Sequence, residues 1–275
     1  MAYRHDWLAR CRECGVLSSS LGINIPSEAG DEALDEGLRE VGLDSLRRGN
    51  NGRLLTRLEG LLGSGRRLLD VGSGPGFLLN QAQDRGFTAE GVEPDANVIS
   101  AARARGAVVR QGFFPAVLGS DERFDAIVFN DVLEHIPDLD EALDSAARHL
   151  APGGVLCLNC PDRRGLYFRV ADLLDRLGVA GPFDRLWQKG LPSPHVWYFV
   201  PADLERAASR RGLAPAGRVR LNTVAFAGLW SRIRYVRGQS LWLSLAAYAF
   251  TLASWPVARL TVSDATACFF RKPGG

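Results

Sequence analysis

The stretch Leu68-Leu69-Asp70-Val71-Gly72-Ser73-Gly74-Pro75-Gly76-Phe77 decides the fold class of this 275-residue chain. An apolar run leads directly into a Gly-x-Gly-x-Gly turn, and a segment of helical spacing follows it. Glycine lacks a Cβ, so such a turn adopts positive φ and brings backbone N–H groups against a ligand. The stretch predicts a strand–turn–helix unit that binds a ligand with its main chain, although similar turns also serve packing alone.

Short apolar runs alternate with amphipathic stretches from residue 67 onward. We expect strands at Leu68–Val71, Ala89–Val92, Ala107–Val109, Ala126–Asn130, Val155–Leu158, Arg218–Val224 and within Leu260–Lys272. We expect helices over 34–46, 54–62, Phe77–Arg85, Ala96–Arg105 and Leu139–Leu150. This alternation predicts an α/β fold in which helices cover both faces of a mostly parallel sheet.

The chain divides into a short N-terminal segment and one large domain. Residues 1–30 are irregular and contain one Cys-x-x-Cys pair, whereas residues 31–275 carry the α/β pattern. The pattern is interrupted over about 161–200 and again over about 229–258. We interpret the first interruption as a lid over the site and the second as a helical insertion.

A carboxylate ends the strand that follows the glycine turn. Glu93, in Gly91-Val92-Glu93-Pro94-Asp95, lies twenty-one residues beyond Gly72. This spacing places an acid at the tip of the neighbouring strand, where it accepts hydrogen bonds from ribose hydroxyls; the alternative is a solvated acid. Nicotinamide sites usually have Gly-x-Gly-x-x-Gly for the pyrophosphate, whereas Pro75 and the tighter glycine spacing suit a cofactor without phosphates.

Two motifs further along the chain indicate a family. Phe124-Asp125-Ala126-Ile127-Val128-Phe129-Asn130-Asp131-Val132-Leu133-Glu134-His135 precedes Leu150-Ala151-Pro152-Gly153-Gly154-Val155-Leu156. With the glycine turn, these motifs resemble the class I S-adenosylmethionine-dependent methyltransferases over about residues 50–160 and again at the closing strand. Within that superfamily the chain is similar to the ubiquinone-biosynthesis O-methyltransferases, whose fourth strand also ends in a hydrophobic–Glu-His signature.

The resemblance implies a Rossmann-like seven-stranded sheet with an antiparallel last strand. It also implies S-adenosylmethionine as cofactor and methyl transfer to the oxygen of a small phenolic, quinone-like or natural-product acceptor. The family commonly offers an acid to the adenine amine, but Gln111-Gly112-Phe113 supplies none. The residues that the resemblance assigns to the cofactor are Arg53 (near its carboxylate, or else a solvated helix arginine), Asp70, Gly72, Ser73, Gly74, Gly76, Glu93, Pro94, Gln111, Gly112, Phe113, Asn130 and Asp131.

Asp131, Glu134 and His135 are candidates for the chemistry at the methyl group. If this segment is helical, Asp131 shares a face with the other two at i+3 and i+4. Methyl transfer needs an aligned nucleophile, and a hydroxyl oxygen benefits from a base or a metal that favours the oxyanion. Two carboxylates and an imidazole could hold a hard divalent ion such as Mg²⁺. The ubiquinone-type enzymes tend to have Glu at Asp131; the alternative role is helix capping.

His195 joins His135 and Asp131 as a candidate catalytic residue. It lies in Ser193-Pro194-His195-Val196-Trp197-Tyr198-Phe199, within the expected lid. A lone histidine beside aromatic residues is more often a packing residue. The aromatic side chains of this region indicate either an apolar or planar acceptor or a small core of the lid itself: Tyr167, Phe168, Trp187, Trp197 and Tyr198.

Two further features have strong structural alternatives. Cys11-Arg12-Glu13-Cys14-Gly15 has the shape of a zinc knuckle, but a structural site needs four ligands, and Cys157 and Cys160 belong to an expected strand. We interpret the pair as a vestige of a zinc ribbon, with a working zinc site as the alternative. Gly238–Ala258 has no charged residue over twenty-one positions. Because it lies between two strands of one sheet, we expect a buried or interfacial amphipathic helix, with membrane or lipid-like contact left open.

Composition and charge limit the partners. A net charge of +2 gives no electrostatic reason to expect nucleic acid. The charged N-terminus and five cysteines indicate a cytoplasmic protein, with a homodimer left open. The main expectation is a small-molecule methyltransferase; the alternatives are a noncatalytic scaffold of the same fold and a nicotinamide-dependent oxidoreductase.

Overall fold

A computed structural model describes residues 5–23 and 35–274. Its main sheet has seven strands in the order β5-β4-β3-β6-β7-β10-β9. Six of these strands run in the same direction, and β10 runs antiparallel to them. The predicted Rossmann-like class with an antiparallel last strand is therefore confirmed. The strands are β3 (Arg67–Val71), β4 (Thr88–Glu93), β5 (Val108–Gln111), β6 (Phe124–Asn130), β7 (Leu150–Pro161), β9 (Ala214–Arg220) and β10 (Ala265–Arg271).

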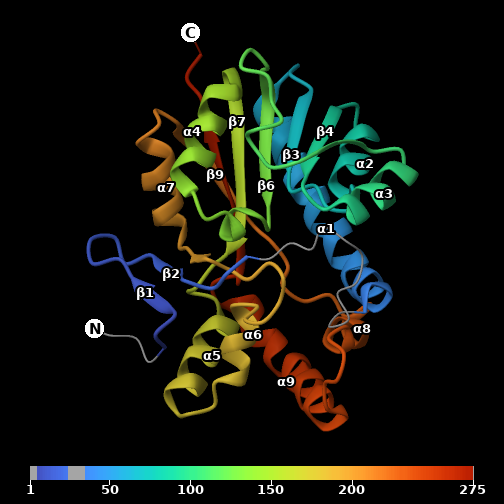
Figure 1. Ribbon diagram of the computed structural model, residues 1–275, viewed down its shortest axis with the longest axis vertical. Coiled ribbons are helices and arrows are strands. Elements are labelled where there is room, and N and C mark those ends of the chain that lie inside the picture. The colour runs from blue at the N-terminus through green and yellow to red at the C-terminus, as the bar shows by residue number, and fades with distance from the viewer. Residues whose placement is uncertain (1–4, 24–34, 275) are drawn as a thin grey trace.

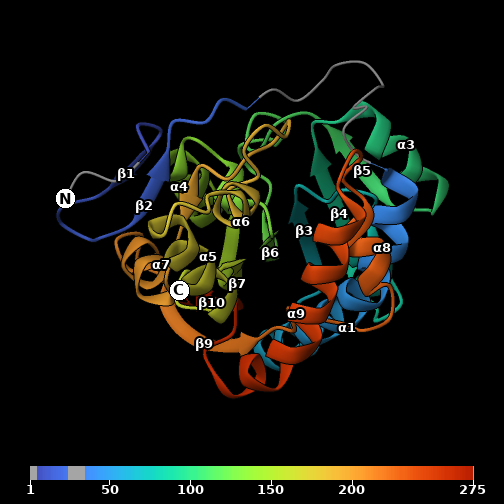
Figure 2. The ribbon, with the colours of Figure 1, turned by 90° about the horizontal axis from the view of Figure 1, so that it is seen from below.

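Helices cover both faces of this sheet (Figure 1, Figure 2). Leucines of α1 and α2 and the apolar side of α3 form one core with the sheet, and α4 and α7 form the other. Continuous apolar runs in the strands are required because both faces are buried. The helices are α1 (Glu36–Leu62), α2 (Phe77–Gln83), α3 (Ala96–Ala104), α4 (Leu139–His149) and α7 (Pro201–Ser209).

Neighbouring residues of a strand enter opposite cores, because side chains alternate along a strand. Leu68 packs on the side of α1, whereas Leu69 packs on the side of α4. Cys157 and Cys160 of β7 are likewise buried in different cores. The prediction that these two cysteines point in different directions is confirmed.

Three elements differ from the sequence-based expectation. α1 is one continuous helix instead of two, and its polar middle is held because buried Asn51 accepts a hydrogen bond from Asn130 of β6 (3.3 Å). β9 starts earlier than expected, since its mostly exposed residues lack an apolar alternation. The N-terminal segment contains the three-residue strands β1 (Leu8–Arg10) and β2 (Leu17–Ser19), which are too short to show a period. Leu34, expected in the first helix, lies outside the described residues.

The two insertions lie beyond the carboxyl ends of the parallel strands (Figure 1). The first contains α5 (Leu166–Arg176), α6 (Gly181–Leu186) and β8 (Trp197–Tyr198), and β8 pairs with β2 of the N-terminal segment. Phe168, Trp187 and Tyr198 are buried in a cluster shared with Leu8 and Leu17. These aromatic residues therefore form the lid's own core.

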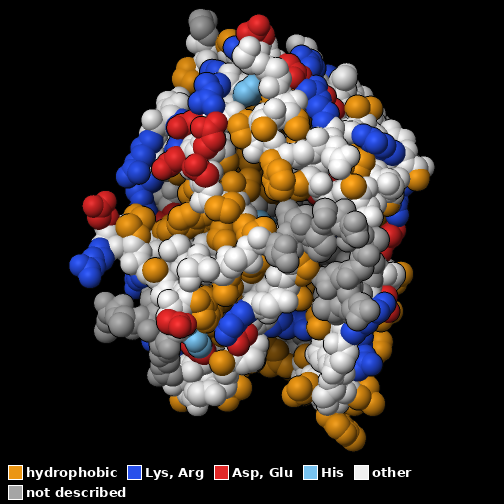
Figure 3. Space-filling model, in the orientation of Figure 1, with side chains coloured by type: hydrophobic (Ala, Val, Ile, Leu, Met, Phe, Trp, Pro, Cys, Tyr) orange, Lys and Arg blue, Asp and Glu red, His pale blue; other side chains and the backbone are white. Residues whose placement is uncertain are grey.

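The second insertion contains α8 (Leu229–Arg234) and α9 (Leu241–Leu260). Of the two structures expected for this segment, the buried one is wrong, because only 6% of the most apolar window of α9 is buried. Among the described residues, this helix is the one that is long and apolar enough to cross a membrane. Apolar side chains are exposed at that end of the molecule (Figure 3).

Candidate functional site

The glycine turn follows β3, and its three glycines have positive φ of 67°, 52° and 79°. A Cβ on Gly72 would lie 2.5 Å from Cγ2 of Val132, and one on Gly76 would lie 2.8 Å from Cβ of Ala107. A Cβ on Gly74 would meet no atom within 4 Å. Packing thus requires the first and third glycines, whereas the main chain at Gly74 borders open space where a ligand fits.

Glu93 ends β4 directly beside this turn. Its carboxylate accepts hydrogen bonds from the backbone N–H of Gly74 (2.9 Å) and of Asp95 (3.1 Å). Burial raises the pKa of Glu93, and burial together with the charge of Glu93 raises the pKa of Asp70 well above its ordinary value. The buried Ser73 hydroxyl has no hydrogen-bond partner among the described residues. The turn and the acid therefore form one group, as predicted, and both retain capacity for a polar ligand.

The residues expected near an adenine border the same group. The backbone N–H of Gly112 donates to the carbonyl of Glu93 (2.9 Å), which joins the end of β5 to the end of β4. Gln111 and Pro94 flank this link, and the ring of Phe113 is 63% exposed beside it. Their contact with an adenine stays a prediction.

Asparagines connect the ends of β6 and β7 to α1. The side chain of Asn159 donates to Oδ1 of Asn130 (2.8 Å) and to Oδ1 of Asp131 (3.0 Å). Asn130 in turn donates to the buried Asn51 of α1. Asn51 and Asn159 were not predicted; the signal that could have found them is an amide inside an otherwise apolar pattern.

Two positive charges from different elements act on Asp131. Burial raises the pKa of Asp131 to about 6, while the charges of Arg47 and Arg232 oppose that rise. Arg232 comes from α8, and its own pKa is lowered by burial. The second insertion therefore brings a cation to the site, which the sequence did not predict.

Arg53 is not brought to this group. Its guanidinium lies on the exposed side of α1 and donates to the carbonyl of Arg220 in β9, at the far edge of the sheet from β4. The exposed side chain matches the alternative of a solvated helix arginine, and the cofactor role of Arg53 stays a prediction. Arg47 is the arginine of α1 whose charge acts on Asp131.

The segment after Asp131 is not an α-helix. Asp131 has a φ of 57°, and only Leu133–His135 form a single 3₁₀ turn, so the predicted face shared by Asp131, Glu134 and His135 is wrong. The group that forms instead contains Glu134, His135 and His195, whose ligand atoms lie within 4.8 Å of one another. The rings of the two histidines are 4.7 Å apart between centroids. The lid thus supplies the third member in place of Asp131.

Backbone hydrogen bonds fasten the lid to this turn. The N–H of Val196 donates to the carbonyl of Glu134 (2.8 Å), and the indole of Trp197 donates to the carbonyl of Ile136 (2.8 Å). Nδ1 of His135 lies 3.1 Å from the carbonyl of Pro194. The hydroxyl of Ser193 lies 3.2 Å from the same nitrogen. A carbonyl only accepts, so this contact favours a hydrogen on Nδ1, and the lone pair of the neutral ring is then on Nε2.

Burial controls the charge of the other two members. Burial, followed by the charge of Asp131, raises the pKa of Glu134 well above its ordinary value, and Oε2 of Glu134 has no partner among the described residues. Burial, followed by His135, lowers the pKa of His195 well below its ordinary value. The amide nitrogen of Gln188 donates to Nε2 of His195 (2.9 Å), so Nδ1 of the neutral ring carries the hydrogen, and it has no partner among those residues. A neutral imidazole and an unpartnered carboxyl oxygen can accept a proton or a metal.

Cys11 and Cys14 are exposed at the turn between β1 and β2. Hydrogen bonding from Cys14 lowers the pKa of Cys11. Within residues 5–23 and 35–274 the pair is not part of a group of three metal-ligating side chains. The interpretation as a vestige of a zinc ribbon stays a prediction.

Residues 43–216 match a family model described as a methyltransferase domain. A trans-aconitate 2-methyltransferase from Rhizobium leguminosarum bv. trifolii is 33% identical over 145 residues, which are 48% of this chain and 55% of the relative. A ubiquinone biosynthesis O-methyltransferase from Nitrobacter winogradskyi is 30% identical over 189 residues, 66% of this chain and 67% of the relative. The chain thus spans little more than half of the first relative and about two thirds of the second.

Solved structures share the fold at low identity. A protein from Galdieria sulphuraria titled as a sarcosine dimethylglycine methyltransferase superposes with a TM-score of 0.58 and 17% identity, covering 92% of this chain and 94% of that one. Magnesium protoporphyrin IX methyltransferase from Synechocystis, with bound S-adenosylhomocysteine, gives a TM-score of 0.55 and 14% identity, covering 90% of each chain. At these identities the likeness concerns the fold.

Proposed function

This chain belongs to the methyltransferase-domain family of S-adenosylmethionine-dependent enzymes, and from that premise we propose that it methylates an oxygen atom of a small molecule. The observation that carries the choice of oxygen is the group of Glu134, His135 and His195 at the end of β6. Transfer of a methyl group to a hydroxyl releases a proton, and this group contains the residues that can take it.

The geometry of the turn fits the cofactor. The open main chain at Gly74 and the unpartnered hydroxyl of Ser73 suit the methionine part, and the carboxylate of Glu93 suits the two ribose hydroxyls. Asn130 and Asp131 then lie on the side from which the acceptor approaches. S-Adenosylmethionine supplies the reactive sulfonium, so the protein has to align the acceptor and exclude water.

His135 is the base in this proposal. It is half-buried, whereas His195 and Glu134 are buried behind it. The oxygen of the acceptor forms a bond to the methyl carbon, the bond from carbon to sulfur breaks, and the hydroxyl proton passes to Nε2 of His135. His195 is a positioning residue, because its lowered pKa keeps it neutral beside the resulting imidazolium.

A divalent metal is an alternative to the base, with a changed ligand set, because an Nε2 of His135 that coordinates an ion cannot take up the proton. Glu134, His135 and His195 replace the predicted set of Asp131, Glu134 and His135: their ligand atoms lie within 4.8 Å of one another, and Oε2 of Glu134 has no partner among the described residues. Two imidazoles and one carboxylate favour zinc, manganese or iron over magnesium. Such an ion would favour the deprotonated form of the acceptor hydroxyl. Unchanged turnover after treatment with a chelator would remove this alternative and leave the base.

A phenolic, quinone-like or natural-product hydroxyl is the acceptor class that we propose. It rests on similarity to the ubiquinone biosynthesis O-methyltransferase. The aromatic residues of the lid give it no support, because Phe168, Trp187 and Tyr198 are occupied in the lid's own core.

A screen with methyl-labelled cofactor tests the function. Catechols, hydroxylated quinone precursors and sugars are each incubated with the protein, and labelled product is located by mass spectrometry. We expect label on a hydroxyl oxygen, and loss of that label in a His135→Ala variant that still binds the cofactor. Cofactor binding without any labelled product would favour the noncatalytic scaffold, and affinity for NAD instead would favour the oxidoreductase.

A further inference from the structure

The large apolar side chains of α9 face solvent, whereas a helix on the surface of a water-soluble protein turns such side chains toward the core. The buried positions of α9 are the small residues Ser244 and Ala258. The half-buried Tyr248 and Trp255 pack on the rings of Trp230 and Phe226. The hydroxyls of Ser244 and Thr251 donate to backbone carbonyls four residues earlier. Its outward side carries large apolar residues, with Trp242 78% and Leu260 87% exposed. The remaining exposed members are Leu241, Leu243, Leu245, Phe250, Leu252 and Val257. An uncharged apolar surface of this extent marks an interaction site.

Both ends of α9 are fixed to the same body. Before it, α8 packs closely on α1, where a Cβ on Gly42 would lie 2.4 Å from the backbone nitrogen of Arg232. After it, the guanidinium of Arg220 donates to the carbonyls of Arg259 and Thr261 (3.2 and 2.7 Å), and the chain enters β10 beside β9. A helix held in this way cannot place its ends on opposite sides of a bilayer. It can lie along a surface with its outer side covered.

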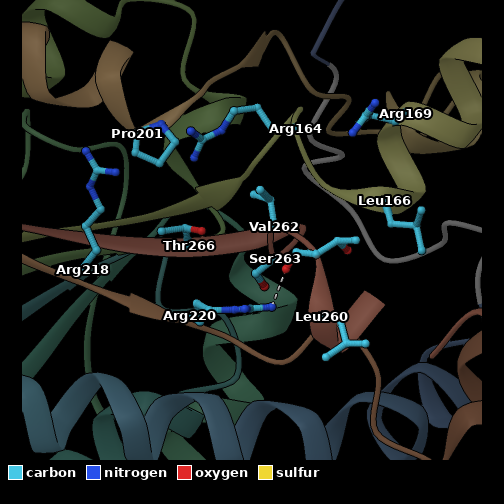
Figure 4. A pocket seen from close by; sticks show the side chains of 11 residues that line it. Arg164, Leu166, Arg169, Pro201, Arg218, Arg220, Leu260, Val262, Ser263 and Thr266 are labelled. Carbon is cyan, nitrogen blue, oxygen red and sulfur yellow. Dashed lines mark hydrogen bonds between the residues drawn. The ribbon is translucent and has the colours of Figure 1, made fainter. Parts of the chain in front are cut away.

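Positive charge predominates around α9. From residue 206 to residue 263 the sequence has no aspartate or glutamate and nine arginines. Four arginines line a cavity of about 650 Å³ at the C-terminal end of α9, together with Leu260 (Figure 4): Arg164, Arg169, Arg218 and Arg220. Arg164 and Arg218 pair with acids, whereas the exposed side chain of Arg169 has no hydrogen-bond or ion-pair partner within the described ranges. The apolar side of α9 is therefore bordered by a place for an anion.

We propose that α9 and this arginine-lined cavity form a docking surface for a membrane that contains anionic phospholipids. The large apolar side chains enter the boundary between headgroups and acyl chains, and the cavity takes a phosphate headgroup. Twenty residues extend about 30 Å, so the helix offers a long line of contact in the membrane plane. α9 lies at the same end as the carboxyl edge of the parallel strands (Figure 1, Figure 2), so the docked protein turns its candidate site toward the bilayer.

A second copy of the chain fits this surface less well than a membrane does. A two-fold interface places the same residues of both copies opposite each other. Arg169 and Arg220, which have no ion pair among the described residues, would then face the same arginines of the other copy, which is unfavourable in a desolvated contact. An anionic bilayer supplies both the apolar phase and the missing negative charge.

Cosedimentation with vesicles tests the proposal on the whole protein. One set of vesicles is phosphatidylcholine alone, and the other is an equimolar mixture of phosphatidylcholine and phosphatidylglycerol. We expect binding to the mixed vesicles that is at least about tenfold tighter than to phosphatidylcholine and that weakens with salt. Absence of binding to mixed vesicles, or equal binding to both, would overturn the proposal.

Paired variants separate the two parts of the surface. Leu243→Ser should weaken binding to mixed vesicles about tenfold, whereas Val108→Ser, an equally exposed apolar change on β5, should leave it unchanged. Arg237 is exposed in the segment between α8 and α9. The double variant Arg169→Gln, Arg237→Gln should bind mixed vesicles about thirtyfold more weakly. The matched double variant Arg123→Gln, Arg148→Gln loses the same charge remote from α9 and should bind nearly as the wild type does. All these side chains are exposed, and urea unfolding verifies that each variant folds.

Sedimentation velocity without vesicles tests the alternative occupant of this surface, a second copy of the chain. A dimer that Leu243→Ser dissociates, together with no vesicle binding by the wild-type chain, would assign the surface to self-association and refute the membrane. A monomer that binds mixed vesicles supports it. Because the assay reads binding and not turnover, its result is independent of the methyl acceptor.

Discussion

The two halves of the candidate site are built in different ways. The half that we assign to the cofactor uses one contiguous turn and the next strand end, and it offers a ligand backbone N–H groups and the carboxylate of Glu93. The half that we assign to the acceptor gathers side chains from the end of β6, from the first insertion and from α8, including His135, His195 and Arg232. A cofactor shared by a family can be held by main chain, whereas an acceptor that varies between relatives requires side chains on insertions.

The largest effect should come from the acceptor half. Replacement of His135 by alanine should lower kcat by about 10²- to 10⁴-fold, the range for loss of a positioned acid–base group. The affinity for S-adenosylmethionine should stay within about twofold, because His135 lies outside the turn. Rapid-mixing kinetics and calorimetric titration measure the two quantities. If the affinity for S-adenosylmethionine fell together with kcat, the cofactor half and the acceptor half of the site would not be separate.

Within the cofactor half, two glycines should respond differently to alanine. Gly74→Ala should lower the affinity for S-adenosylmethionine about 100-fold, since the Cβ enters the space of the ligand, while the left-handed backbone costs about 1–2 kcal/mol of stability. Gly76→Ala should cost about 2–5 kcal/mol of stability, since its Cβ would meet Ala107. Titration and urea unfolding of both variants compare them. Equal affinity losses at equal stability would refute the distinct roles assigned to these glycines.

Glu93→Gln should have an intermediate effect. The amide keeps the shape of the side chain but removes the charge that strengthens hydrogen bonds from ribose hydroxyls, so affinity should fall about tenfold or somewhat more. Adenine and 2′,3′-dideoxyadenosine, which lack the two ribose hydroxyls, should bind both proteins alike in the same titration. An unchanged affinity for the intact cofactor would leave Glu93 with its structural bond to Gly74 alone.

The last prediction concerns the stability of the fold and its dependence on pH. The folded state binds the Glu134 proton more tightly than the unfolded state does, so this residue lowers stability as the pH rises above its ordinary pKa of 4.5. Glu134→Gln should therefore be more stable than the wild type by about 1–3 kcal/mol at pH 7, and the difference should vanish near pH 4.5. Urea unfolding over this pH range measures it. A variant that is less stable at pH 7 would indicate that the Glu134 charge is paired.

The half of the site assigned to the cofactor could be predicted from the sequence better than the half assigned to the acceptor. The turn and Glu93 were predicted because their relation is set by short-range spacing within one strand–helix–strand unit. Joining His195 to Glu134 requires knowledge of how a lid some sixty residues later folds back onto β6, which periodicity does not contain. Asp131 was misplaced because its left-handed φ interrupts the helix that a spacing argument assumes.

The helices show a similar limit. The positions of the central strands and helices followed from apolar patterns that both faces of a buried sheet impose. The charge of Arg47 on Asp131 was not predicted, since α1 carries several arginines and spacing alone does not say which of them lies near the end of β6. The sequence of α9 predicts an apolar helix whether its surroundings are protein or membrane. The fold shows that the small residues Ser244 and Ala258 face inward.

A crystal structure of the chain with S-adenosylhomocysteine would test the central claim most directly. We predict that Glu93 accepts hydrogen bonds from both ribose hydroxyls, that the ligand lies against the main chain of Gly74, and that its sulfur faces His135 and His195. A nucleoside bound away from this turn, or a sulfur directed away from the two histidines, would contradict the account.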